Sequence, residues 1–194
     1  MNSHEHHRRS IRLQDYDYAQ NGAYFVTICT QDRANWFGEI AEGETVLNSA
    51  GKMIERWWYE LERKFPEIDL DAFVIMPNHV HGVIVIVGAD LRVCPDPANQ
   101  LDQGAHIGAP LQSESSNPSL SQIVQWFKTM TTNDYIRGVK DHAWQPFQGR
   151  LWQRNYYEQV IRHEPMLNEI REYIVFNPGR WAEDRENLAN VSRN

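Results

Sequence analysis

The sequence of 194 residues has little cysteine, little positive charge and few long apolar runs. Two cysteines, Cys29 and Cys94, are too few for a disulfide framework, and their positions suggest no cysteine-based zinc site. No stretch approaches the roughly 20 apolar residues that cross a membrane. The polar residues 1–10 lack the apolar core of a signal peptide. We therefore expect a cytoplasmic protein without a membrane partner.

The net charge of −7 argues at first sight against a nucleic-acid-binding protein, because neutralisation of phosphates supplies much of the affinity for nucleic acids. The charge is unevenly distributed. Residues 39–71 carry nine acidic and four basic side chains, whereas residues 119–162 carry six basic and three acidic ones. The second region also holds several aromatic side chains, on which unpaired bases can stack, although at least half of them are expected in the core.

Candidate DNA contacts follow from this distribution. In the basic region they are Lys128, Arg150 and Arg154. At the N-terminus, Arg12 closes a cluster of histidines and arginines that could act as a phosphate-contacting arm or could equally be a disordered tail.

Periodicity predicts a single α+β domain over residues 1–194. Strands are expected at residues 23–30, on both sides of Pro77, and near residues 156–161; helices are expected at residues 47–64, from Ser119 and over residues 165–177. Ser119 and Gln122 have the spacing of a capping box. Residues 88–118 are rich in Pro, Ser, Gln and Asn and lack periodicity, so we expect a flexible insertion that interrupts the domain without dividing it.

The segment from residue 71 to residue 87 (DAFVIMPNHVHGVIVIV) contains the pair His79 and His81. Two apolar runs with β-branched residues flank Pro77 and Asn78, which predicts two antiparallel strands joined by a tight connection. Residues two apart in a strand project from the same face, so the two imidazoles can bind one metal ion. A pair of this kind is also compatible with structural histidines, and two imidazoles alone leave a divalent ion short of ligands.

Residues 165–177 (PMLNEIREYIVFN) read as an amphipathic helix that Pro178 and Gly179 terminate. Tyr173 and Asn177 are four residues apart and share the flank of its apolar stripe, so both side chains can point at a neighbouring strand. By position alone, Tyr173 could be a half-buried aromatic residue and Asn177 a helix terminator.

These two segments together resemble the single-tyrosine HUH transposases, which comprise insertion-sequence transposases and REP-associated tyrosine transposases. The resemblance rests on Pro77-Asn78-His79-Val80-His81 and on Glu172-Tyr173-Ile174 followed by Asn177-Pro178. Supporting similarity lies in residues 22–30 and 151–162 and in Phe127-Lys128. It extends from about residue 11 to residue 181 and implies a ferredoxin-like two-layer sandwich, with the histidines on a central strand of an antiparallel sheet.

The resemblance also implies a chemistry and its residues. His79, His81 and Asn177 would hold a divalent ion, Mg²⁺ or Mn²⁺, and Tyr173 would be the nucleophile. The implied reaction cleaves single-stranded DNA, or DNA beside a hairpin, through a 5′-phosphotyrosine and later rejoins strands without a nucleotide cofactor. Insertion-sequence relatives are typically dimers, so the resemblance allows a homodimer, although REP-associated relatives need not be dimers.

Alternatives remain at this stage. Tyr156 and Tyr157 compete with Tyr173 for the role of nucleophile, although they lie in a segment that reads as a strand. The chain could be a DNA-binding regulator that retains the fold without catalysis. It could also be a metal-dependent phosphodiesterase with a water nucleophile, which the absence of an acidic cluster beside the histidines disfavours.

Overall fold

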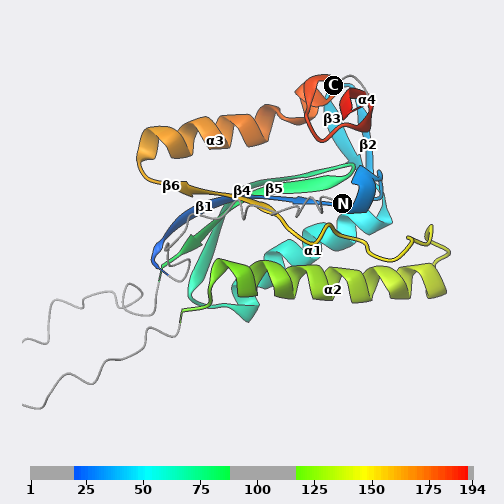
Figure 1. Cartoon of the computed structure of the whole chain (residues 1–194), viewed down its shortest axis with the longest axis horizontal. Coiled ribbons are helices and arrows are strands. Elements are labelled where there is room, and N and C mark those ends of the chain that lie inside the picture. The colour runs from blue at the N-terminus through cyan, green and yellow to red at the C-terminus, as the bar shows by residue number, and fades with distance from the viewer. Residues whose placement is uncertain (1–19, 88–116, 192–194) are drawn as a thin grey trace, which may run out of the picture.

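The computed structural model describes residues 20–87 and 117–191 (Figure 1). Arg12 and the N-terminal basic cluster, Cys94, and all but the last two residues of the expected insertion at 88–118 lie outside the described residues. Within the described part, no helix is long and apolar enough to span a membrane.

The main sheet has four strands in the order β4-β5-β1-β6, and each neighbouring pair is antiparallel. The strands are β1 (Gly22–Cys29), β4 (Ile68–Met76), β5 (His79–Ile86) and β6 (Tyr157–Ile161). β4 and β5 form the hairpin expected around Pro77, and the two histidines open β5. Since β5 lies between β4 and β1, the expected position of the histidines on a central strand of an antiparallel sheet is confirmed.

Helices cover both faces of this sheet (Figure 1). α1 (Ser49–Lys64) and α2 (Leu120–Asp141) lie on one face, and α3 (Glu164–Phe176) lies on the other. Side chains of β1 alternate accordingly: Tyr24, Val26 and Ile28 join the larger core under α1 and α2, whereas Phe25 joins the smaller core under α3. The α+β class is confirmed, and α3 adds a layer on the second face.

The helix starts follow their local sequence. Ser119 accepts a hydrogen bond from the backbone N–H of Gln122, and Gln122 accepts one from the backbone N–H of Ser119, so the predicted capping box is present. The Asn48 side chain caps α1 by accepting from Gly51 N–H at 2.9 Å, and the His163 ring caps α3 by accepting from Met166 N–H at 3.2 Å.

Several small elements at one end of the sheet were not predicted. These are η1 (Gln31–Arg33), the hairpin of β2 (Gly38–Ala41) and β3 (Glu44–Leu47), η3 (Pro178–Glu183) and α4 (Leu188–Val191). Figure 1 shows η3 and α4 at the same end of the molecule as the β2–β3 hairpin. The chain after α3 therefore returns to the end of the sheet where β5 begins.

Gly82 lets α1 approach the sheet directly behind the histidines. It follows His81 in β5, on the α1 face, and a Cβ atom at this position would overlap the indole of Trp58. Trp58 is fully buried and lies against the rings of Phe73 and Phe127. The missing side chain of Gly82 thus sets the distance between α1 and the strand that carries the site.

We predict that Gly82→Ala lowers the free energy of unfolding by about 1–3 kcal/mol, because an added methyl group overpacks a close-packed core. Urea denaturation followed by circular dichroism measures the loss. Gly22→Ala is the control, since a Cβ atom there meets only ordinary contacts with Tyr24. Equal stability of the two variants would contradict the close approach.

Candidate metal centre and nucleophile

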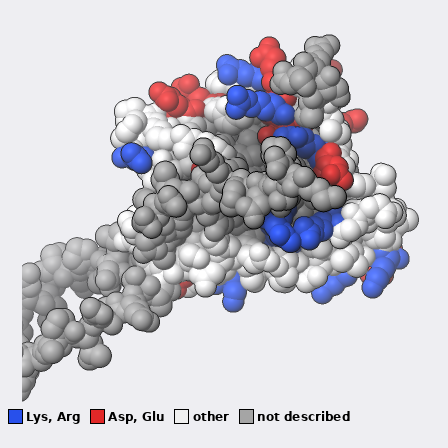
Figure 2. All heavy atoms as spheres, viewed as in Figure 1, with Lys and Arg blue, Asp and Glu red and all other residues white. Residues whose placement is uncertain are grey.

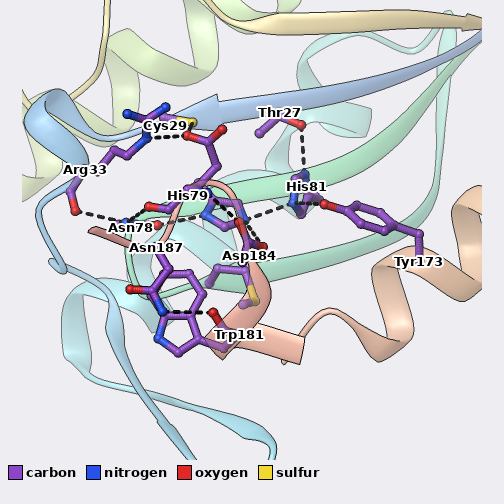
Figure 3. Close-up of polar contacts among 12 residues, drawn as sticks. Thr27, Cys29, Arg33, Asn78, His79, His81, Tyr173, Trp181, Asp184 and Asn187 are labelled. Atoms are coloured by element: carbon purple, nitrogen blue, oxygen red, sulfur yellow. Dashed lines mark hydrogen bonds and ion pairs between the residues drawn. The ribbon is translucent and has the colours of Figure 1, made fainter. Parts of the chain in front are cut away.

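His79 and His81 point from the same face of β5 toward α3 (Figure 3). Their Nε2 atoms lie 2.9 Å apart, and both side chains are buried. Two nitrogen ligands about 2.1 Å from one ion lie roughly 3.0–3.4 Å from each other when their bonds are about 90–110° apart. The observed separation is therefore close to that of two imidazoles sharing a metal ion.

Asn78 fixes the orientation of the His79 ring. Its side-chain amide group donates to the backbone carbonyls of Arg33 at 2.9 Å and Glu186 at 2.8 Å. Its Oδ1 atom therefore faces His79 Nδ1, at 2.8 Å, and must accept the Nδ1 proton. His79 Nε2 is then left with a free lone pair, which is the state of a metal-binding histidine.

His81 has a comparable partner on the next strand. Its Nδ1 atom lies 2.8 Å from Thr27 Oγ1, across the β1–β5 register that pairs these two residues. Burial lowers the pKa of His79 to about 3, and burial followed by the proximity of His79 lowers the pKa of His81 well below its ordinary value. Both rings are thus neutral at physiological pH. Two neutral rings with Nε2 atoms in contact need a proton or a cation between them.

A buried carboxylate lies beside the two imidazoles, and a second buried oxygen belongs to Asn177. Asp184, which is 8% exposed, places Oδ2 3.9 Å from His79 Nε2, and this oxygen has no hydrogen-bond partner among the described residues. Asn177 Oδ1 is also buried without a partner in the described part of the chain. One ligand atom from each of His79, His81 and Asp184 lies within 4.8 Å of the others. Since an unpaired buried oxygen is costly, the donor set fits a divalent ion, and the His-His-Asp cluster can bind one.

The sequence had not pointed to Asp184. Asp184 directly follows η3, in a short charged stretch without periodicity, and nothing local separates it from surface carboxylates. Asn177, the ligand implied by the resemblance, is the C-cap of α3 and lies next to Pro178. The structure thus places a carboxylate oxygen beside the histidines, whereas Asn177 as a ligand remains a prediction.

Tyr173 extends from α3 toward His81 (Figure 3). Its hydroxyl oxygen lies 3.2 Å from His81 Nε2, its ring makes edge contacts with Phe25 and His81, and it remains 42% exposed. Burial and then the charge of Asp184 raise its pKa to about 12, while interaction with Asn177 opposes the rise. The tyrosine therefore combines a contact with the cluster and access from solvent.

Cys29 and Glu186 tie the segment after η3 to the end of β1. The Cys29 thiol donates to Glu186 Oε2 at 3.3 Å, and Arg33 Nε donates to the same oxygen at 2.7 Å. Burial and the nearby carboxylate raise the pKa of the thiol, so it stays protonated. Cys29 thus acts as a hydrogen-bond donor beside the cluster and is not one of its metal ligands.

The three candidate DNA contacts from residues 119–162 line a groove of about 390 Å³ beside α2. Its lining includes Lys128, Arg150 and Arg154 with the polar side chains of Thr129 and Asn133, and none of the described residues that line it is acidic. Figure 2 shows Lys and Arg side chains over the segment that precedes β6. The groove therefore presents positive charge within a chain of net negative charge.

Lys128 has a different part in this groove from the two arginines. Its ammonium donates to the backbone carbonyls of Gln153, Arg154 and Asn155 at 3.0, 3.4 and 3.1 Å. An ammonium group has three donors, so these contacts use its whole capacity. Lys128 consequently holds the segment that carries Arg154, while Arg150 and Arg154 remain exposed.

No family model matches the chain. An uncharacterized protein of Haemophilus influenzae is 36% identical over 184 residues, which cover 93% of both chains. Among solved structures, a REP-associated tyrosine transposase bound to a REP hairpin aligns over 87% of this chain and 73% of its own, with a TM-score of 0.52 and 16% identity. A putative transposase of Deinococcus radiodurans aligns over 86% of this chain and 96% of its own, with a TM-score of 0.43 and 15% identity.

The first of these structures shares the arrangement of an antiparallel four-stranded sheet with packed helices. At 16% identity the likeness concerns the fold. The identity to the Haemophilus influenzae protein extends over nearly the whole of both chains. The chain therefore belongs to the same family as that Haemophilus influenzae protein and shares its fold with a REP-associated tyrosine transposase.

Proposed function

We propose that the chain is a metal-dependent DNA strand transferase that cleaves single-stranded DNA through a 5′-phosphotyrosine at Tyr173 and later rejoins strands. The observation that carries the proposal is the contact of the Tyr173 hydroxyl with His81, 3.2 Å away, at the edge of a buried His-His-Asp cluster. A nucleophile next to a metal site is the arrangement that phosphoryl transfer requires.

The proposed ligands of the divalent ion are His79, His81 and Asp184, with Asn177 as the amide ligand that the resemblance implies. Nitrogen and oxygen donors without thiolate suit Mg²⁺ or Mn²⁺, and the imidazoles favour Mn²⁺. When bound, the ion would polarise the scissile phosphate and offset the charge on the leaving oxygen. The low pKa values of the two histidines keep both rings ready to bind it.

The reaction is a transesterification that needs no water. The Tyr173 oxygen forms a bond to phosphorus, and the bond from phosphorus to the 3′ oxygen breaks. The proton of the phenol ends on the released 3′ oxygen, which becomes a free hydroxyl. Attack of a 3′-hydroxyl on the phosphotyrosine reverses these changes and frees Tyr173, so the energy of the phosphodiester is conserved.

The residues around Tyr173 govern its reactivity. Burial and Asp184 raise the pKa of the phenol to about 12, so the group is protonated before reaction. A cation bound by Asp184 would cancel this carboxylate charge and lower the pKa of Tyr173. All the proposed groups lie in one chain, so this geometry permits cleavage within a monomer, and a homodimer remains a prediction.

The proposed substrate is single-stranded DNA or DNA beside a hairpin, and the proposed location is the cytoplasm. The structural neighbour is bound to a REP hairpin, which supports a DNA partner. Arg150 and Arg154, in the basic groove, are the proposed contacts with phosphates, and Lys128 supports them through its three carbonyl contacts. Arg12, outside the described residues, remains a prediction.

Tyr173→Phe should abolish covalent attachment to DNA, because only the hydroxyl oxygen is removed. The assay incubates labelled single strands from the DNA flanking the gene with Mn²⁺ or with chelator, and detects the adduct on a denaturing gel. Tyr156→Phe and Tyr157→Phe should retain the adduct. An adduct that survives in Tyr173→Phe would assign the nucleophile elsewhere. DNA binding without any adduct would favour a regulator, and metal-dependent hydrolysis without an adduct would favour a phosphodiesterase.

Asp184→Asn should weaken Mn²⁺ binding by about ten- to a hundred-fold, because a ligand carboxylate loses its charge. Isothermal titration calorimetry of the full chain with Mn²⁺ measures the change in affinity. Glu183→Gln, at the exposed neighbouring residue, removes the same charge and should bind as the original chain does. Asn177→Ala tests the amide ligand in the same titration. Unchanged affinity in Asp184→Asn would remove the carboxylate from the proposed ligand set.

Replacing Arg150 and Arg154 together by Ala should weaken DNA binding and reduce the slope of log K against log salt concentration by about 0.7 per lost phosphate contact on a single strand. Binding of a fluorescent single strand between 50 and about 200 mM salt measures the slope. Arg63→Ala serves as control, since Arg63 is an exposed cation of α1 paired with Glu60. A slope equal to that of the control would show that the groove does not contact the DNA backbone.

A further inference from the structure

Tyr157 lies in the same cross-strand row as the proposed site. It pairs with Thr27 in the β1–β6 register, and Thr27 pairs with His81 in the β1–β5 register. Residues directly opposite each other on antiparallel strands project from the same face. Because Thr27 points at the His81 ring, Tyr157 also projects from the α3 face of the sheet.

The distance along this row suits a neighbouring nucleotide. Two strand spacings of about 4.8 Å place the Tyr157 backbone roughly 10 Å from that of His81. This is too far for Tyr157 to replace Tyr173, whose hydroxyl is 3.2 Å from His81 Nε2. It is near enough for a base one or two nucleotides from the scissile phosphate, given the rise of about 3.4 Å per nucleotide along a stacked strand.

The Tyr157 ring is available to a ligand. It is 45% exposed, although it opens an edge strand of the sheet that also contains the buried Ile161. Its hydroxyl reaches Gln159 Oε1 only at 3.5 Å, the outer limit of a hydrogen bond. A large aromatic ring with so weak a polar contact, beside a catalytic cluster, offers a flat surface on which a base can stack.

The chain before Tyr157 connects this ring to the basic groove. Arg154, which lines the groove, is three residues upstream. Backbone hydrogen bonds between Gln153 N–H and the Cys29 carbonyl, at 3.0 Å, and between Gln31 N–H and the Leu151 carbonyl, at 2.8 Å, hold this segment against the end of β1. Cys29 is in turn paired with His79. Because β6 is an edge strand, a DNA strand with its phosphates at the groove can pass around this edge and over Tyr157 before it reaches Tyr173.

We infer that Tyr157 forms a nucleobase subsite, on which a base of the single strand next to the scissile phosphate stacks. The inference rests on the proposed function, since it names how the same site positions its DNA. Stacking engages the face of a base and is tolerant of its identity, so this subsite positions the strand without reading its sequence. Tyr157 is then a positioning residue. Its ring contributes to DNA binding, whereas its hydroxyl does not.

The test measures equilibrium binding of a fluorescent single strand from the flanking DNA to the full chain carrying Tyr173→Phe, so that no cleavage intervenes. Adding Tyr157→Ala should weaken binding by about five- to 150-fold, whereas Tyr157→Phe should leave it unchanged. Tyr59→Ala is the matched control, because Tyr59 is 56% exposed on α1, away from the site. Circular dichroism verifies that each variant is folded.

A second arm replaces successive nucleotides of the strand by abasic residues. At one position, the abasic replacement should weaken binding to the protein that retains Tyr157. The same replacement should not weaken binding further in Tyr157→Ala, because the base and the ring form one contact. Binding by Tyr157→Ala that equals the Tyr59→Ala control, or an equal loss in Tyr157→Phe, would overturn the inference. Failure of the proposed function is distinguishable, since it appears as an absent adduct with Tyr173 intact, whatever the binding results.

Discussion

The Asn78 side chain is the constraint on which the site depends. It is fully buried in the tight connection between β4 and β5, and its three hydrogen bonds reach the segment after β1, the segment after η3 and the His79 ring. The Asn78 amide group therefore fixes the tautomer of His79 and the positions of two backbone segments. Its removal would leave two carbonyls and a ring N–H unpaired in the interior, which costs more than the bonds themselves contribute.

Burial then determines what the cluster can bind. Neutral imidazoles offer lone pairs, and the carboxylate of Asp184 adds an oxygen donor that lacks a hydrogen-bond partner among the described residues. A site of this kind is unfavourable when empty, because polar groups have lost water without gaining partners. Burial and the charge of Asp184 also raise the pKa of Tyr173. Under the proposed function, a cation bound by Asp184 would therefore favour the phenolate.

The sequence predicted those features that depend on neighbouring residues. The apolar runs around Pro77, the capping box at Ser119 and the helix stop at Pro178 are local, and they placed the histidines on a strand and Tyr173 on a helix. The central position of that strand was implied by the family resemblance. Asp184 and the Lys128 contacts depend on residues far apart in the chain, and neither has a periodic or motif signal. The β2–β3 hairpin was not predicted because its strands have only four residues each, which is too short for a clear alternating pattern.

The span of the chain between contacting groups bears on the order of folding. Cys29 and Glu186 are 157 positions apart, and Tyr173 and His81 are 92 apart. Contacts that close such long loops pay a larger entropy cost than the β4–β5 hairpin and form slowly. The β4–β5 hairpin can therefore form, with its histidines in place, before the tyrosine and the carboxylate arrive. An incompletely folded chain would then carry the two histidines without Asp184 or Tyr173 beside them, which would confine the proposed chemistry to the folded molecule.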